Sequence, residues 1–328
     1  MDRIMTSERV RRLLGSMTLV DFNSQVREQA TRQFERAFEA ELLADLFDLS
    51  ALEMLLASDA MPATYIDVIT NGLPKRLADL QRSSGKAGLE LVADSVRRGA
   101  TIRVSDIQRF HGGLGSFTRE IAAYFAAQVQ INAYLTPPGH VGFNPHFDTT
   151  DIFIVQCVGA KEWKIFGDYT GRLDLPLLET PWAPELYLPS PEFEALTLKA
   201  GDVLYLPRGV MHQARCNDQA SLHLTISLAP LTPAEVLTRE IKRLIEEDVE
   251  LRKRIDWSIG SDAGHVSQLN ATLRKLLLGL ADRLDLAGLL AAEELRLQRP
   301  PVSEAGELQA AIASLDEAAG RATSPRTL

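Results

Sequence analysis

The chain has 328 residues, of which 45% are hydrophobic and 24% are charged, and its formal net charge is −9. This length fits one large domain or two ordinary ones, and the composition is that of a globular protein. The negative charge argues against a nucleic-acid-binding protein that neutralises phosphates, and no apolar run approaches the roughly 18 to 20 residues of a membrane span.

The N-terminus and the cysteine content predict the compartment. The first 15 residues lack the continuous apolar stretch of a signal peptide. The two cysteines, Cys157 and Cys216, are too few for a disulfide framework in a chain of this length. We therefore expect a reducing, cytoplasmic location without a membrane anchor.

Helical patterns dominate the sequence before about residue 129. Residues 26–47 are rich in good helix formers and predict a helix. Ser50 and Glu53 form a capping-box pattern ahead of further apolar residues, which predicts a helix start. Residues 116–128 repeat apolar side chains at helical spacing and predict another helix.

From about residue 129 to residue 229 the pattern changes to short β-like runs separated by turns. The clearest runs are 130–137, 151–158, 162–167, 195–198, 202–207 and 221–228. Consecutive strands without intervening helices predict a barrel or jelly roll. With helices on both sides of this region, the chain is expected to belong to the α+β class.

Helical signals return after the β-rich region. Thr232 is a predicted N-cap, followed directly by a proline and, three residues after the cap, by Glu235. Residues 266–286 predict a second amphipathic helix, and residues 303–320 predict a last one. Because apolar helix stripes need partners, we expect a homodimer formed through residues 232–300.

Two ionisable side chains, His146 and Asp148, lie among apolar residues at the start of a predicted strand. Residues i and i+2 of a strand share a face, so the two groups point the same way. Burying them costs several kcal/mol unless they are paired or bind a metal ion. His212, which opens a later strand, is the best candidate for a third ligand. Two histidines and a carboxylate form a facial triad, which suits Fe(II) because three coordination positions stay open.

Each candidate residue alone also has an ordinary structural explanation. A single histidine or aspartate in a strand is usually a hydrogen-bonded part of the core. A lysine in a hairpin turn, such as Lys161 in GAKEW, is normally solvated, and Trp163 is expected in the core. His223 is either a residue that supports the site or a hydrogen-bonded core histidine. The metal-site interpretation therefore depends on three ligands occurring together.

Residues 132–166 and 201–214 together resemble the JmjC branch of the cupin superfamily. They are most similar to the cupin-4 type enzymes called ribosomal oxygenases, which are Fe(II)- and 2-oxoglutarate-dependent hydroxylases of protein side chains. The resemblance covers about residues 100–230. It combines the HxD motif, the GAKEW turn and the proline–glycine–histidine segment in the same order.

The resemblance implies a fold and a domain organisation. A double-stranded β-helix, or cupin jelly roll, at about 129–229 would form the core of a catalytic domain that spans residues 1–230 with its N-terminal helices. Residues 231–328 would form a helical dimerisation region, and they contain no convincing winged-helix pattern. Fe(II), 2-oxoglutarate as cosubstrate and O2 are the implied cofactors.

The resemblance also implies roles for the metal-site residues. His146, Asp148 and His212 match the iron ligands of the family. Lys161, thirteen residues after Asp148, matches the basic residue that pairs with the distal carboxylate of 2-oxoglutarate, a task that suits an ammonium on a flexible stem.

Further residues are implied to contact the cosubstrate. Asn132 matches a polar position of the cosubstrate pocket, and Tyr134 shares its strand face. Ser227 resembles a position that contacts a cosubstrate carboxylate. Because the register of residues 221–228 is uncertain by two residues, Thr225 is the alternative.

Three interpretations of function stay open. The first is a dioxygenase that hydroxylates a protein or peptide side chain, with hydroxylation favoured over demethylation by the resemblance; a ribosomal protein is one candidate substrate. The second is the same chemistry on a small molecule or a natural-product peptide. The third is a non-enzymatic metal-binding cupin with a regulatory or interaction role.

Overall fold

The computed structural model describes residues 7–58, 61–84, 88–254, 263–285 and 287–292. The chain divides into two compact units, residues 1–256 and 257–328. Within the described ranges, no helix is both long enough and apolar enough to cross a membrane. The helix expected over 303–320 lies outside the described residues.

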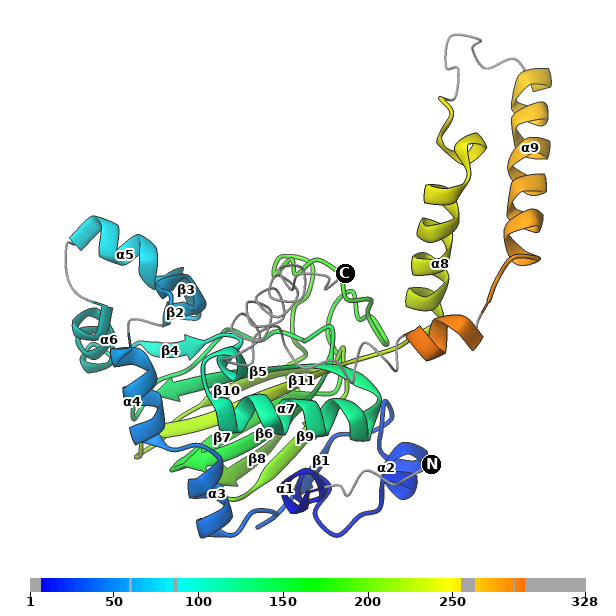
Figure 1. The fold of residues 1–328 in the computed structure, drawn as a ribbon. Coiled ribbons are helices and arrows are strands. Elements are labelled where there is room, and N and C mark those ends of the chain that lie inside the picture. The colour runs from blue at the N-terminus through cyan, green and yellow to red at the C-terminus, as the bar shows by residue number, and fades with distance from the viewer. Residues whose placement is uncertain (1–6, 59–60, 85–87, 255–262, 286, 293–328) are drawn as a thin grey trace, which may run out of the picture. The chain divides into compact units, whose positions relative to one another are not determined.

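Two antiparallel sheets form the centre of the first unit (Figure 1). The larger sheet has the strand order β1-β9-β6-β11-β5-β4-β2-β3 and the smaller one β10-β7-β8. The strands are β1 (Arg32–Phe34), β2 (Ile66–Thr70), β3 (Leu73–Arg76), β4 (Thr101–Val104), β5 (Ala127–Thr136), β6 (Asp151–Val158), β7 (Ala160–Phe166), β8 (Phe193–Lys199), β9 (Val203–Leu206), β10 (Met211–Arg215) and β11 (Ser221–Pro230). The predicted α+β class with a double-layered β-core is confirmed.

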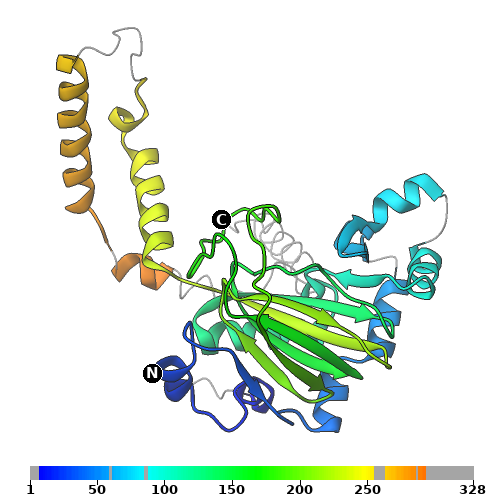
Figure 2. The same cartoon turned by 180° about the vertical axis from the view of Figure 1, so that it is seen from behind.

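Helices cover one face of the larger sheet. The helices before the β-core are α1 (Glu8–Arg12), α2 (Leu19–Gln25), α3 (Ala40–Leu46), α4 (Leu49–Ala57), α5 (Leu77–Ser84), α6 (Gly88–Arg97) and α7 (Gly112–Phe125). The helices after it, which do not belong to this layer, are α8 (Pro233–Glu247) and α9 (Ala263–Ala281). Figures 1 and 2 show α7 along one face of the larger sheet and the smaller sheet across the opposite face. The central strands of the larger sheet are therefore covered on both faces.

Strand β6 illustrates why the central strands read as continuous apolar runs. Its Phe153 and Val155 belong to the core between the sheet and the helices. Its Ile152 and Ile154 belong to a second core between the two sheets, which also contains Trp163. A strand that is buried on both faces needs apolar residues at every position, so alternation is lost there.

One predicted helix is replaced largely by other structure. Residues 26–47 were expected to be helical, but β1 lies in their middle and only α3 is helical. Strand β1 pairs with β9, with Arg32 opposite Tyr205. The Tyr205 hydroxyl accepts a hydrogen bond from the backbone N–H of Glu28 at 2.9 Å. Sheet pairing and this buried contact override the local helix propensity.

Of the two predicted capping boxes, one is confirmed and one is wrong. The capping box at α8 is confirmed, because Thr232 accepts from the backbone of Glu235 while the Glu235 side chain accepts from the backbone of Thr232. The box expected at Ser50 is wrong. Asp48 caps α4 instead, accepting from the N–H of Ala51 at 2.8 Å. An aspartate two positions earlier satisfies the same free N–H groups, so the helix starts sooner.

Candidate active site

The structure brings His146, Asp148 and His212 together at one end of the two sheets. One potential ligand atom from each residue lies within 4.8 Å of the others, and Asp148 Oδ2 is 3.7 Å from His212 Nε2. Reciprocal backbone hydrogen bonds of 2.7 and 3.1 Å join His146 to His212. This isolated bridge holds His146 and His212, which are far apart in the sequence, next to each other. Two imidazoles and one carboxylate thus form a three-donor cluster.

Backbone carbonyls orient both imidazole rings. The Nδ1 atom of His146 lies 2.8 Å from the carbonyl oxygen of Asn144, and that of His212 lies 3.0 Å from the carbonyl oxygen of Val210. A neutral imidazole that donates from Nδ1 presents the lone pair of Nε2 to a cation. Burial, and then the proximity of His146, lowers the pKa of His212 to about 4, so this ring is neutral at physiological pH.

A glycine turn supports the segment that carries His146. Gly72, in the turn between β2 and β3, has a φ of +78°, and its backbone forms a bridge to Phe143. A Cβ atom on Gly72 would lie 2.2 Å from Oδ1 of Asn144. Because both the backbone conformation and the close approach exclude a side chain, glycine is required here. The N-terminal hairpin therefore helps to position a metal-ligand candidate.

A narrow cavity extends from the three-donor cluster into the space between the sheets. The larger sheet contributes residues of β5, β6 and β11 to its wall, and the smaller sheet contributes residues of β7 and β10. The lining residues are Tyr134, Gly142, Phe143, His146, Asp148, Ile152, Lys161, Trp163, His212, Ala214, His223 and Thr225. Six of the eight residues singled out by the sequence therefore share this wall: the three members of the His–Asp–His cluster, Lys161, Tyr134 and Thr225.

Lys161 is the most unusual charged residue of the cavity. It is only 2% exposed, and its ammonium donates to the Thr136 hydroxyl at 2.9 Å. It forms no ion pair with a carboxylate of the described residues. Burial lowers the pKa of Lys161 to about 8. A buried ammonium without a counter-ion is costly, so the cavity is suited to an anionic ligand that would pair with it.

Tyr134 and His223 are neighbours across the larger sheet. They occupy paired positions of β5 and β11, and their rings stack at 4.9 Å between centroids. Burial raises the pKa of Tyr134 to about 12, and its hydroxyl is hydrogen-bonded by Arg103. Arg103 donates in turn to Asp67 at 2.9 Å. The hydrogen bonds of Arg103 to Tyr134 and to Asp67 therefore hold the Tyr134 side chain in place in the cavity wall.

Two of the residues predicted to contact the cosubstrate do not line the cavity. The side-chain oxygen of Asn132 accepts from the backbone N–H of Asp106 at 3.1 Å. Ser227 pairs with Gln130 of β5 and lies two residues beyond Thr225 on β11. The β11 register therefore places Thr225 in the cavity wall and Ser227 outside it. The roles of these residues toward the cosubstrate stay predictions.

Sequence reasoning missed part of the cavity wall. Trp163 is in the core, as expected, but it also lines the cavity, and its ring lies 5.8 Å from that of His212. Its position two residues after Lys161 on the same strand was a usable signal, because both side chains share a face. Phe143 was not predicted to line the cavity. It lies in the loop between β5 and β6, and no strand pattern predicts the course of that loop.

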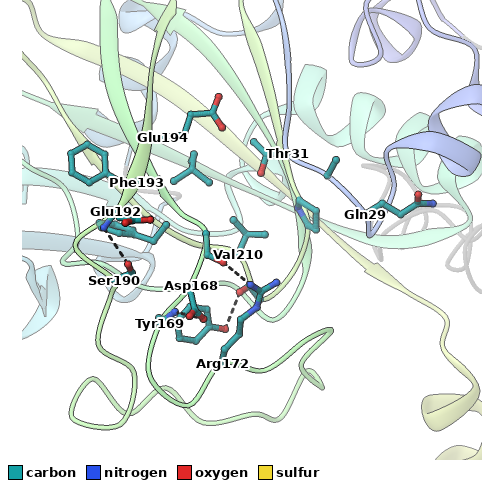
Figure 3. A pocket seen from close by; sticks show the side chains of 16 residues that line it. Gln29, Thr31, Asp168, Tyr169, Arg172, Ser190, Glu192, Phe193, Glu194 and Val210 are labelled. Carbon is teal, nitrogen blue, oxygen red and sulfur yellow. Dashed lines mark hydrogen bonds between the residues drawn. The ribbon is translucent and has the colours of Figure 1, made fainter.

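A larger groove with a volume of about 710 Å³ lies beside the three-donor cluster (Figure 3). Residues 207–210 separate the two: the Gly209 N–H donates to the Asp148 carbonyl, while the Val210 carbonyl orients His212. The groove contains three carboxylates, from Asp168, Glu192 and Glu194, and one guanidinium, from Arg172. It is open and acidic, unlike the narrow cavity.

The long loop between β7 and β8 bears an aromatic cluster next to the three donors. Trp182 is 40% exposed, stacks on Tyr187 at 5.5 Å, and contacts Phe147 with 5.3 Å between ring centroids. The centroid of the Trp182 ring lies 6.4 Å from that of His146. This loop therefore forms an aromatic rim at the outer side of the site.

Facing sheets with a His–Asp–His cluster at one end form a candidate metal site of the cupin type. The model of the JmjC domain family matches residues 107–236. The chain therefore contains a JmjC domain, and the resemblance seen in the sequence is confirmed.

The named relatives of this chain are ribosomal oxygenases and related enzymes. Ribosomal oxygenase 1 of Gallus gallus is 32% identical over 222 residues, which cover 64% of this chain and 36% of the relative. Ribosomal oxygenase 2 of Rattus norvegicus is 33% identical over 255 residues, covering 73% and 52%. The bifunctional lysine-specific demethylase and histidyl-hydroxylase NO66 of Dictyostelium discoideum is 32% identical over 219 residues, covering 64% and 41%. The chain thus spans about a third to a half of the length of these relatives.

Among solved structures, the X-ray structure of E. coli YcfD is similar in fold. Its TM-score is 0.52 at 14% sequence identity, and the match covers 80% of this chain and 68% of that chain. At this identity the likeness is one of fold, and it agrees with the double-layered β-core and its helices.

Proposed function

We propose that this protein is an Fe(II)- and 2-oxoglutarate-dependent dioxygenase that hydroxylates a side chain of a protein or peptide. The proposal rests on two features that share one cavity. They are the His146, Asp148 and His212 cluster and the buried Lys161 ammonium, which has no counter-ion among the described residues. A metal ion at the cluster and a dicarboxylate reaching Lys161 would satisfy both.

The side chains fit these ligands. His146, Asp148 and His212 supply two imidazoles and one carboxylate, a donor set that suits Fe(II) and leaves positions open. Lys161 and Thr136 would bind the distal carboxylate of 2-oxoglutarate. When bound, iron and 2-oxoglutarate supply the oxidising chemistry, in which O2 is consumed and succinate and carbon dioxide are released. The protein fixes the donor geometry and excludes bulk water from a narrow cavity.

The remaining cosubstrate contacts follow from the cavity wall. Tyr134 and Thr225 line it, and we propose them as the polar contacts along the body of 2-oxoglutarate. Tyr134 is positioned for this by Arg103 and by its stacking on His223. The cavity favours Thr225 over the alternative Ser227.

The relatives support a protein substrate and hydroxylation. Two are named ribosomal oxygenases, and the name of the third includes both lysine-specific demethylase and histidyl-hydroxylase. One structure of E. coli YcfD, with a TM-score of 0.50, is in complex with cobalt and succinic acid, and succinate is the product expected here. The open groove beside the cluster has room for an extended segment, which favours a polypeptide over a small molecule.

Turnover tests the proposal. Protein supplied with Fe(II), 2-oxoglutarate and a protein extract is expected to release succinate and to add one oxygen atom to a protein side chain, detected by mass spectrometry. His146→Ala protein should release none. Equal succinate release by both proteins would contradict the mechanism. Succinate release only with a small-molecule extract would favour the second interpretation, and metal binding without 2-oxoglutarate binding would favour a non-enzymatic cupin.

We further propose a cytoplasmic homodimer, with residues 1–230 as the catalytic domain and residues 231–328 as the dimerisation region. Both cysteines are free and buried, which fits a reducing compartment. In α9, exposed apolar side chains include Leu273, Leu277 and Leu278. Such a face is costly in water unless a partner covers it.

The dimer is tested by light scattering at micromolar concentration. Wild-type protein is expected at twice the mass of the chain, and Leu277→Glu should shift it toward monomer because a carboxylate cannot be buried unpaired in an apolar interface. Gln268→Glu, an equally charged change at an exposed polar position of α9, is the control and should stay dimeric. A monomeric wild-type protein would contradict the proposal.

A further inference from the structure

The wall of the narrow cavity contains polar ring atoms for which the described part of the chain provides no hydrogen-bond partner. Nε1 of Trp163 and Nδ1 of His223 are buried side-chain atoms without a hydrogen-bond partner. Trp163 is 4% exposed and His223 is 3% exposed, and both residues line the cavity. Buried polar groups are almost always paired, so two orphans in one wall require an explanation.

The identity of these groups restricts the missing partner. An indole N–H is a donor only, and an imidazole carries at least one N–H in either of its protonation states. The ammonium of Lys161 has three N–H groups, of which the Thr136 hydroxyl accepts one. The wall is therefore rich in donors, and its complement is a ligand with several acceptor oxygens.

The two rings are held in fixed orientations. His223 stacks on Tyr134 with an interplanar angle of 4°, and its ring also meets that of Trp163 edge-on, with centroids 5.5 Å apart. Trp163 lies on the same strand as Lys161, two residues further along, and its ring is 5.8 Å from that of His212. The Trp163 ring thus lies near both the Lys161 ammonium, at 6.0 Å, and the His212 ring, and His223 lies next to it.

We propose that Trp163 and His223 are positioning residues for 2-oxoglutarate, whose carboxylate oxygens accept hydrogen bonds from their ring N–H groups. This inference rests on the proposed function. Lys161 supplies the charge that attracts the dicarboxylate, while the two ring donors fix its orientation between Lys161 and the metal. Directional donors on locked rings suit this task, since they lose little conformational freedom on binding.

Binding without turnover tests the inference. Mn(II)-loaded protein, kept free of oxygen, is titrated with 2-oxoglutarate by calorimetry. Trp163→Phe keeps the ring and removes the N–H, and it is expected to weaken 2-oxoglutarate binding about 10-fold, as is usual for a hydrogen bond to a charged group. His223→Leu should have a similar effect. His223→Asn places an amide near the position of Nδ1 and should restore binding to within about 3-fold of wild type.

Controls separate the inference from the proposed function. Mn(II) affinity should be unchanged in all three variants, because none removes a metal-ligand candidate. Tyr65→Phe, which removes a polar hydrogen outside the cavity, should bind 2-oxoglutarate like wild type. Wild-type affinity in both Trp163→Phe and His223→Leu would overturn the inference and leave the function standing. Failure of wild-type protein to bind 2-oxoglutarate would overturn the function and the inference with it.

Discussion

Replacement of Asp148 by alanine is expected to weaken divalent metal binding by about 100-fold or more and to abolish succinate release. Changes to residues that merely support metal ligands already cost roughly 10- to 100-fold in affinity. Asp148 is the only carboxylate of the three-donor cluster, so without it a dication would face two neutral imidazoles. The measurement is calorimetric titration with Mn(II), which resists oxidation, followed by a succinate assay with Fe(II).

The fold of the Asp148→Ala protein should be intact. The Asp148 side chain is 37% exposed, and the backbone carbonyl that accepts from Gly209 remains. The thermal midpoint of the metal-free protein should therefore stay within a few degrees of wild type. Asp218→Ala, an exposed carboxylate away from the cavity, is the matched control and should keep its metal affinity. Unchanged Mn(II) binding by Asp148→Ala would mean that the cluster is not the metal site.

The strands and the metal-ligand candidates were predictable because each leaves a local pattern. In β11, alternate residues separate into an apolar face, which includes Leu224 and Ile226, and a polar face with His223 and Thr225, as the structure has it. The HxD spacing likewise indicated two ionisable groups on one side of the chain, although the expected strand start there is wrong: His146 forms only an isolated bridge, and β6 begins after Asp148, at Asp151. Such signals depend only on neighbouring residues and on the geometry of a strand.

What escaped prediction depends on contacts between distant segments. The strand β1 forms because β9 offers it a free edge, which residues 26–47 do not encode. Asn132 shares a strand with Tyr134, yet its side-chain oxygen accepts from the backbone of Asp106 and it does not line the cavity. The missing acceptors of Trp163 and His223 are a property of the assembled cavity. The residue pattern of a single strand cannot predict these missing partners.

Replacement of Lys161 by methionine is expected to have two effects of opposite sign. Binding of 2-oxoglutarate should fall by about 100-fold or more, because a charge-assisted contact to the distal carboxylate is lost. The ligand-free protein should become more stable, since an ammonium without a counter-ion is replaced by an apolar chain of similar length. The lowering of the Lys161 pKa from 10.5 to about 8 corresponds to roughly 3 kcal/mol of unfolding free energy.

The matched control is Lys164→Met on the same strand. Lys164 is partly exposed and lies over the ring of Phe193, outside the cavity. It should leave both 2-oxoglutarate affinity and stability nearly unchanged. Calorimetric titration and chemical denaturation measure the two quantities. A Lys161→Met protein that binds 2-oxoglutarate like wild type would exclude Lys161 as the carboxylate anchor.

The pH dependence of these quantities follows from the same lysine. Because burial makes the pKa of Lys161 lower in the folded chain than in the unfolded chain, the unfolded chain binds more protons between about pH 8 and pH 10.5. Stability of the ligand-free wild type relative to Lys161→Met should therefore rise with pH across this window, and the gap between them should close. Affinity for 2-oxoglutarate should move the other way, constant below about pH 8 and falling above it as the ammonium is lost. If affinity instead stayed level to pH 10, the cosubstrate would not be held by the charge of Lys161, and its buried ammonium would need another partner.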